Sequence, residues 1–303
     1  MGGMFQALGT VLFPVILVAG LGALLSSRLP IDQATISRIT LYLLSPALVL
    51  NTVLTTPVRA AEALQLGAAY LGVLVLCVGL GWLCGLGRPR PEQRSLAASV
   101  GIWNSGNMGL PIALFAFGQA GFDRATLLFL MSFVGMYVVG PLLYGGAASQ
   151  GVWGLLKTLF RLPAITVALV ALGWRLLHLP VPAGALRGIE LLSQATLPMV
   201  LLSLGLQLGA GGWPRLHGRL WLATAARLVG GPLVALGVGT LAGLQHGALA
   251  VLVLSAGMPT AVNALLLGRE YGGDTETVAG VVLLSTLASV VTVAVVVMLL
   301  PRL

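Results

Sequence analysis

Apolar runs of about twenty residues recur every 25 to 30 residues or so along the chain, and they leave little choice of fold. A helix of that length rises far enough to cross a hydrocarbon core about 30 Å thick. The composition agrees, because 58% of the 303 residues are hydrophobic, only 8% are charged, and the mean hydropathy is +1.02. So little polar sequence does not cover the surface of a water-soluble domain of this size. The sequence therefore predicts an all-α membrane protein.

Polar breaks between the runs divide the chain into ten predicted transmembrane segments. They cover residues 5–25, 35–55, 62–86, 96–118, 124–145, 161–178, 186–209, 219–243, 246–268 and 275–300. Basic residues flanking these segments are unequally shared between the two sides. One side holds Arg28, Arg38, Arg88, Arg90, Arg94, Lys157, Arg161, Arg215, Arg219 and Arg269, and the other holds Arg59, Arg124, Arg175, Arg187 and Arg302. By the positive-inside rule the first side faces the cytoplasm, which predicts a multi-pass protein of the cell (inner) membrane with both termini outside.

Landmarks in the first half return in the second half in the same order, about 150 residues later. The matching pairs are Pro14 and Pro163, Pro46 and Pro198, Pro111 and Pro259, and Asp123 and Asp274. Because five crossings per half is an odd number, the second half enters the membrane from the opposite side. The sequence thus predicts a 5+5 inverted repeat, with residues 1–150 as the first repeat and 151–303 as the second.

Segments four and nine contain the least helix-like sequence in the chain. Segment four holds the run from Asn104 to Pro111, and segment nine holds the run from Ser255 to Asn263. Proline removes a backbone donor and clashes with the carbonyl four residues earlier, at a cost of about 3 kcal/mol inside a helix, and glycine also opposes helix formation. An open backbone at membrane depth is tolerated only inside protein or beside a watery cavity. We therefore expect two broken helices; a simpler interpretation is a pair of proline kinks that only help packing.

Broken helices would place charged helix ends in the middle of the membrane. The outgoing half-helices begin there with the positive ends of their dipoles, and the incoming half-helices end there with free carbonyl groups. Such a site can bind an anion, with a small cation nearby. The candidate substrate-binding residues at these breaks are Asn104, Asn107, Gly109, Pro111, Gly257, Pro259, Thr260 and Asn263.

The chain resembles the auxin efflux carrier family, which contains bacterial organic-acid permeases and plant PIN-type carriers. The resemblance covers essentially the whole chain. Its most specific parts are Asn104 to Pro111, Pro198-Met199 followed by Ser203-Leu204-Gly205-Leu206, and Arg269-Glu270-Tyr271. It implies a fold similar to bile-acid symporters and sodium/proton antiporters, with segments one, two, six and seven as a scaffold. Segments three to five and eight to ten would form a mobile domain that moves as an elevator.

The resemblance also implies a role for one asparagine. In the plant carriers the asparagine seven positions before the proline of segment four binds substrate, and Asn104 stands at that position before Pro111. The plant pattern has a second proline in segment nine, where this chain has Ala264. The short connection between segments five and six is similar to that of compact bacterial members.

Three further polar residues lie inside predicted segments. A charge at the centre of a membrane helix costs about 2.5–3.5 kcal/mol, so Arg227 is expected to face protein or a cavity. There it balances an anionic substrate or clamps broken-helix carbonyls; the simpler interpretation is an arginine that snorkels or pairs structurally. Asn51 either lines the scaffold side of the pathway or makes an interhelical hydrogen bond. Glu190 either caps a helix or carries a proton.

The expected function is secondary transport, or uniport, of a small organic anion such as an auxin-like carboxylate or a dicarboxylate. The alternatives are a channel-like facilitator, a cation-coupled symporter of another solute, and an intramembrane enzyme or sensor. No catalytic constellation favours an enzyme. We expect no cofactor and no bound metal; a coupling ion, if used, would be Na⁺ or H⁺. The expected partners are the substrate, the lipid bilayer and a second copy in a homodimer, with no nucleic acid, since the basic residues are scattered.

Overall fold

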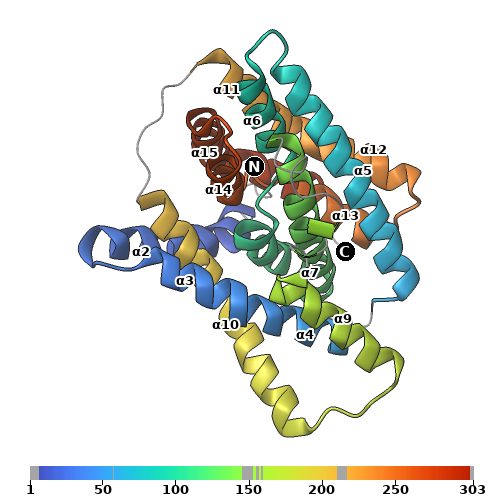
Figure 1. Ribbon diagram of the computed structural model, residues 1–303. Helices are drawn as coiled ribbons and strands as arrows, with labels where there is room; N and C mark the ends of the chain where they lie inside the picture. Colours follow the sequence, from blue (N-terminus) through green and yellow to red (C-terminus); the bar gives the residue numbers. More distant parts are fainter. Residues whose placement is uncertain are drawn as a thin grey trace.

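The computed structural model describes residues 7–56, 58–144, 153–154, 157, 160–209 and 217–300. Within these ranges the chain forms helices and no named strand, which confirms the all-α class (Figure 1). Arg215, Arg302 and the predicted repeat boundary at 150/151 lie outside the described residues.

The helices of the first half are listed here with π-helical turns marked η. They are η1 (Ala7–Leu12), α2 (Phe13–Arg28), α3 (Gln33–Ile39), η2 (Thr40–Leu44), α4 (Ser45–Thr55), α5 (Ala60–Cys84), α6 (Arg90–Gly101), η3 (Ser105–Gly109) and α7 (Leu110–Tyr144). The helices of the second half are α9 (Pro163–Leu176), α10 (Ala183–Gly209), α11 (Gly218–Ala225), η5 (Ala226–Gly230), α12 (Gly231–Leu241), α13 (His246–Ala256), α14 (Val262–Glu270) and α15 (Thr275–Leu299).

Seven helical stretches of the described chain are long and apolar enough to cross a membrane. Their most apolar windows are only 28% to 44% buried within the protein, so more than half of each window is partly or fully exposed. Leu64, Leu191 and Leu233 are examples of large side chains that are more than half exposed on these outer faces. Apolar surface on this scale is suited to lipid rather than to water, which supports the membrane class. Helices α9 and α13 are shorter apolar helices.

Helices α2 and α10 pack so closely that their backbones touch (Figure 1). A Cβ on Gly22 would collide with the Leu202 carbonyl oxygen, and a Cβ on Gly205 would collide with the Ala19 carbonyl oxygen. Small residues at such positions let membrane helices approach and make van der Waals contact over a large area. Helix α4 packs against both α9 and α10, which completes one group of neighbouring helices.

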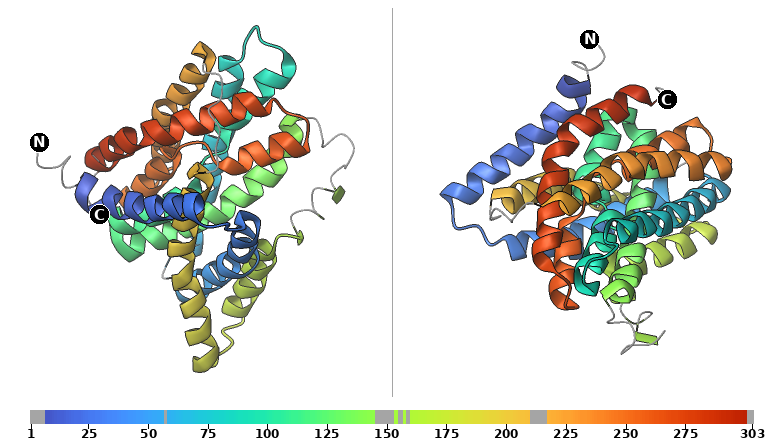
Figure 2. Two further views of the ribbon diagram at one scale, coloured as in Figure 1. Left: turned by 90° about the vertical axis from the view of Figure 1, so that its left-hand side faces the viewer. Right: turned by 90° about the horizontal axis from the view of Figure 1, so that it is seen from above.

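The remaining helices pack mainly against one another. Helix α5 lies beside α6 and α12, and α13 lies beside α7 and α12 in the middle of the bundle (Figure 1). The described ends of the chain, η1 and α15, also lie side by side (Figure 2). Helix α7 is kinked at Gly118, whose positive φ of 64° suits glycine, so α7 consists of two helical rods that meet there.

Candidate functional site

The helix of segment four is interrupted between Gly101 and Ser105. Helix α6 ends at Gly101, Ile102 continues in an extended conformation, and the π-helical turn η3 starts at Ser105 and leads into α7. Pro111 is the second residue of α7, directly after the π-helical turn η3. The interruption lies where the sequence predicts one.

The helix of segment nine is interrupted between Ala256 and Val262. Helix α13 ends at Ala256 and α14 begins at Val262, with Gly257 and Pro259 in the non-helical stretch between them. Thr260 in this stretch is held twice: its backbone N–H donates to the Ser285 Oγ at 3.1 Å, and its hydroxyl donates to the Ser99 carbonyl oxygen at 2.7 Å.

The two interruptions cross each other and pair through their backbones. Trp103 and Thr260 form an antiparallel bridge. The Asn104 N–H donates to the Pro259 carbonyl oxygen at 2.8 Å, and the Ala261 N–H donates to the Ile102 carbonyl oxygen at 3.0 Å. These bonds satisfy the backbone groups that the breaks release, as burial at membrane depth requires.

Arg227 of η5 connects the two incoming half-helices. Its side chain is fully buried, and its two terminal nitrogens donate to the carbonyl oxygens of Val100 and Ala256. Val100 lies in the last turn of α6 and Ala256 is the last residue of α13. The Arg227 Cζ also lies 4.7 Å from the centre of the Trp103 ring, which is cation–π distance. These are the contacts that a clamp on broken-helix carbonyls, one of the roles open to Arg227 from the sequence, requires.

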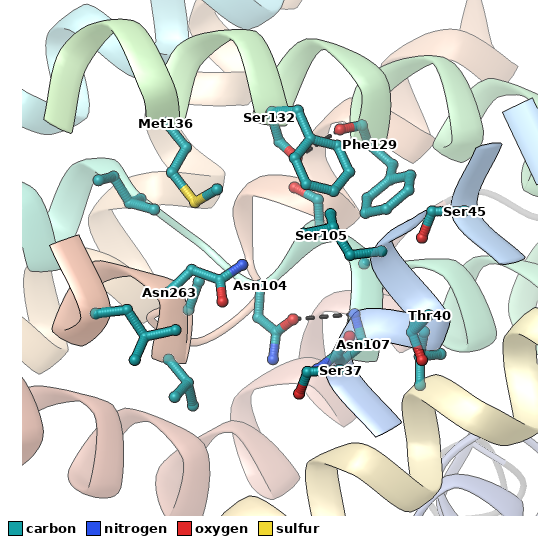
Figure 3. A pocket seen from close by; sticks show the side chains of 18 of the residues that line it. Ser37, Thr40, Ser45, Asn104, Ser105, Asn107, Phe129, Ser132, Met136 and Asn263 are labelled. Carbon is teal, nitrogen blue, oxygen red and sulfur yellow. Dashed lines mark hydrogen bonds between the residues drawn. The ribbon is translucent and has the colours of Figure 1, made fainter. Parts of the chain in front are cut away.

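A cavity of about 510 Å³ opens beside the crossing (Figure 3). Its walls come from α3, η2, the start of α4, α5, the end of α6, the first interruption, η3, α7, α10 and α14. The polar residues among its lining are Gln33, Ser37, Arg38, Thr40, Ser45, Asn104, Ser105, Asn107, Ser132, Ser203, Gln207 and Asn263. The aromatic ones are Tyr70, Trp103, Phe129, Phe133 and Tyr137. Amides and hydroxyls thus share the cavity with an aromatic wall, and Arg38 is the one charged residue in its described lining.

The polar groups of the first interruption point into this cavity. The Asn104 side-chain oxygen accepts a hydrogen bond from the Asn107 N–H at 3.0 Å and so caps η3 (Figure 3). This bond leaves the Asn104 amide nitrogen for a ligand. The Ser105 hydroxyl is buried and has no hydrogen-bond partner. A buried polar group without a partner is costly, so the Ser105 hydroxyl is an unsatisfied polar group next to Asn104 in the cavity wall.

Arg38, the charged residue of the described cavity lining, lies in helix α3. The N-cap of this helix is Asp32, whose carboxylate accepts hydrogen bonds from the Thr35 hydroxyl at 2.5 Å and from the Ala34 N–H at 3.0 Å. The Thr35 hydroxyl, and then the Ala34 N–H, lower the pKa of the Asp32 carboxyl from its ordinary value. The cap stays ionised at neutral pH and fixes the start of the helix that presents Ser37 and Arg38.

The predicted site residues fall into three groups. Asn104, Asn107 and Asn263 line the cavity, and Figure 3 shows them around one space. Other predicted residues build the crossing without lining the cavity; they are Gly109, Pro111, Gly257, Pro259 and Thr260. Asn51 and Glu190 lie outside both sets: Asn51 is in α4, and the exposed Glu190 carboxylate accepts a 3.3 Å bond from Gln194 in α10.

Several lining residues were not singled out from the sequence. The sequence identifies Arg38 only as one of the basic residues that set the topology, and Ser105 only as part of the run from Asn104 to Pro111. Ser105 directly follows Asn104 in the broken segment, which is a signal that could have found it. Phe129, Tyr137 and Gln207 lie in ordinary apolar helices, so only the packing of α7 and α10 brings them here.

A membrane-embedded helical bundle with a polar cavity at the crossing of two interrupted helices has the features of a membrane transporter. The comparisons agree. A family model described as membrane transport protein matches residues 153–297. An uncharacterized transporter of Methanocaldococcus jannaschii is 25% identical over 86% of this chain and 87% of its own length. A protein of Rhizobium meliloti named "Putative malonate transporter" is 26% identical over 83% of this chain and 82% of its own length.

These relatives span both halves of the chain, and the family model matches the second half. The family model and the relatives confirm the resemblance to the auxin efflux carrier family, and the chain is similar to membrane transporters over most of its length.

Proposed function

We propose that this protein moves a small organic anion across the cell membrane by alternating access, and that the cavity beside the crossing binds the anion. The observation that carries the proposal is the character of the lining. It combines Arg38, three asparagine side chains and several hydroxyls with no carboxylate among the described lining residues. A cavity of this kind attracts negative charge and offers it hydrogen-bond donors.

The negative group of the substrate would bind at the first interruption. The Asn104 amide nitrogen and the unpartnered Ser105 hydroxyl supply donors there, at the start of η3 and α7. Asn263 lies in the first turn of α14, so a second helix start faces the same space. Helix N-termini favour anions through their free N–H groups and their dipoles.

The aromatic wall would hold the apolar part of the substrate. Phe129 and Phe133 stack edge to face with ring centres 4.8 Å apart and line the cavity. A volume of about 510 Å³ accepts a small carboxylate together with water. The relative named for malonate transport suggests a dicarboxylate as one substrate class, beside the auxin-like monocarboxylates that the family resemblance implies.

The proposed mechanism is an elevator with ten crossings in a 5+5 inverted repeat. Two of the ten crossings would be broken spans, one formed by α6 with the start of α7 and the other by α13 with α14. The part of α7 after its kink at Gly118 would be a crossing of its own. Helices α2, α4, α9 and α10 would be the scaffold, and the rest would carry the site. Contacts of α2 with α10 and of α4 with α9 support this grouping.

The cavity would open toward the cytoplasm. Arg38 belongs to the side that the positive-inside count assigns to the cytoplasm, and both Arg38 and Asn263 are exposed. Export of an anion from a cell with a negative interior is driven by the potential, worth about 2.3 kcal/mol per charge per 100 mV. Import of the same anion requires coupling to another gradient.

The proposal is tested by flux into proteoliposomes that contain the purified protein. Radiolabelled mono- and dicarboxylates are screened first, and the best substrate is then compared between wild type and Asn104→Asp. Aspartate keeps the oxygen that caps η3 but replaces the amide donor with a negative charge. We expect the apparent affinity for the anion to fall at least about tenfold, since repulsion and a lost charge-assisted bond act together.

The matched control is Gln245→Glu, which makes the same amide-to-acid change at the start of α13, where Gln245 is exposed, makes no capping hydrogen bond and lies outside the cavity lining. Its transport should equal wild type. Wild-type affinity in a well-folded Asn104→Asp protein would remove the proposed site. Saturable flux that is stimulated by substrate on the far side would exclude a channel-like facilitator.

A further inference from the structure

We propose that the Arg227 guanidinium is a resident cation of the crossing: it occupies the place of a coupling metal ion and makes transport independent of sodium. The inference rests on the proposed function for its transport readout, but the site itself is defined by geometry. Its central observation is that one side chain binds the carbonyl ends of both incoming half-helices.

The carbonyl ends of interrupted helices are places where cations bind. The last carbonyl groups of a helix lack N–H partners and carry the negative end of its dipole. In transporters with broken helices such carbonyls coordinate Na⁺ near the midplane. Here the carbonyl oxygens of Val100 and Ala256 each accept one of the two terminal nitrogens of Arg227 instead. A metal ion at this point would have to displace the guanidinium and would be repelled by its charge.

The charge of Arg227 is not neutralised by a carboxylate in the described part of the chain. The two ion pairs found there are Arg88 with Glu92 and Arg124 with Glu62. A fully buried guanidinium is costly unless something compensates its charge. The two helix-end carbonyls and the Trp103 ring compensate part of this cost, while the Arg227 Nε is buried without a hydrogen-bond partner in the described part of the chain. The crossing therefore contains a permanent positive charge.

The neighbouring backbone provides the space for this contact. A Cβ built on Gly231 would collide with the Arg227 guanidinium and would lie 2.5 Å from the Ala256 carbonyl oxygen. Arg227 itself lies in the π-helical turn η5, just before Gly231 starts α12. A glycine at this position is thus required for Arg227 to reach Ala256.

The charge also lies directly behind the cavity. Trp103 lines the cavity and its ring contacts the Arg227 guanidinium. Arg227 is not among the lining residues, so it acts on a bound anion through the field and through the position of the crossing. It is a positioning residue rather than a direct ligand.

The first experiment is thermal unfolding of the purified wild-type protein in detergent, with choline chloride replaced by sodium chloride at constant ionic strength. A ligand that binds the folded state raises Tm by mass action. We expect no sodium-specific increase in Tm. A sodium-specific increase of about 3 °C or more would overturn the inference, and this readout does not require the substrate to be known.

The second experiment removes the resident cation. Arg227→Ala leaves the two carbonyls without a donor, so added guanidinium chloride at millimolar concentration should raise its Tm by about 3 °C while leaving the wild type unchanged. Anion flux into proteoliposomes should fall at least about tenfold and be partly restored by the same guanidinium. A folded Arg227→Ala protein with wild-type flux, or one that guanidinium does not rescue, would contradict the proposal.

A third variant covers the case in which Arg227→Ala does not fold. Gly231→Ala keeps Arg227 but displaces its guanidinium from the Ala256 carbonyl oxygen. The adjacent Gly230→Ala is the control, because a Cβ there meets only the tip of the Leu80 side chain, at 3.3 Å. Gly231→Ala should lower anion flux at least about fivefold, and Gly230→Ala should lower it less than twofold. Equal effects would overturn the role of the contact. If the wild type moves no anion at all, the proposed function fails, and the sodium and guanidinium effects on Tm still decide the cation site.

Discussion

The indole N–H of Trp103 donates a hydrogen bond of 3.0 Å to the Ser255 hydroxyl oxygen, and this bond ties the first interrupted helix to the second. Trp103 also packs against Tyr70, with ring centres 4.9 Å apart, and both rings line the cavity. One face of the cavity wall is thus fixed to α13, on which Ser255 is the residue before Ala256.

This contact predicts coupling between the two residues. Trp103→Phe removes the donor and Ser255→Ala removes the acceptor, so each change alone should destabilise the crossing by roughly 0.6–2 kcal/mol. The double variant should cost clearly less than the sum, because the second change removes a group that the first left unpaired. The measurement is the apparent Tm in detergent for all four proteins. Fully additive losses would show that the bond contributes nothing.

The close approach of α2 and α10 predicts a sharp difference between two glycines of one helix. Gly205→Ala should separate the helices and cost about 1–3 kcal/mol, since its Cβ would meet the backbone of Ala19. Gly188→Ala, also in α10, meets nothing within 4 Å and should leave stability unchanged or raise it slightly. Thermal unfolding compares the two variants directly. A tolerated alanine at position 205 would mean that the helices are less tightly packed than described.

The proposed cytoplasmic opening predicts which face of the protein a reagent reaches. In a background in which the buried Cys77 and Cys84 are replaced by alanine, Asn263→Cys should react with a membrane-impermeant thiol reagent from the cytoplasmic side. Substrate should slow the reaction. Ala264→Cys is the control, because Ala264 is the next residue along and is fully buried. Faster labelling of Asn263→Cys from the outside would reverse the orientation.

The hydrogen bond between Thr56 and Asp123 predicts how a mutation would shift the equilibrium between the cytoplasm-open and outward-open states. The Thr56 hydroxyl donates to the Asp123 carboxylate at 3.3 Å and joins the end of α4 to α7, which the proposed elevator assigns to different parts. Thr56→Val should favour the outward-open state and slow cytoplasmic labelling of Asn263→Cys by about threefold to tenfold.

Thr55→Val is the matched control for this change. The Thr55 hydroxyl donates only to the Asn51 carbonyl oxygen of its own helix, at 2.7 Å, so its loss should leave the labelling rate unchanged. If both valine variants label at the wild-type rate, the contact between Thr56 and Asp123 does not hold the outer side closed.

The sequence predicted the interruptions well because their causes are local. Glycine and proline oppose a helix wherever they stand, so Asn104 to Pro111 and Ser255 to Asn263 could be identified without neighbours. The three asparagines of those runs lie at the interruptions and line the cavity beside them. Arg227 could be recognised as a residue that needs partners, since an intramembrane charge is costly wherever it lies.

The rest of the site depends on contacts between distant elements. Nothing in the apolar helices α7 and α10 shows that Phe129 and Gln207 turn toward the cavity rather than toward lipid. Asn51 and Glu190 are candidates from the sequence because they are polar residues inside apolar segments. The packing of α4 and α10 places both outside the cavity lining. Arg38 looked like a topology signal because the sequence does not show that α3 turns this residue inward.

The backbone pairing of Trp103 with Thr260 also limits which insertions and deletions this part of the chain can accept. In paired extended segments a slip of one residue turns every side chain to the opposite face. Adding or deleting one residue between α6 and η3 would therefore turn Asn104 away from the solute path, however suitable the new residue. For these few positions the spacing between the flanking helices constrains the chain more than the identity of any one amino acid does.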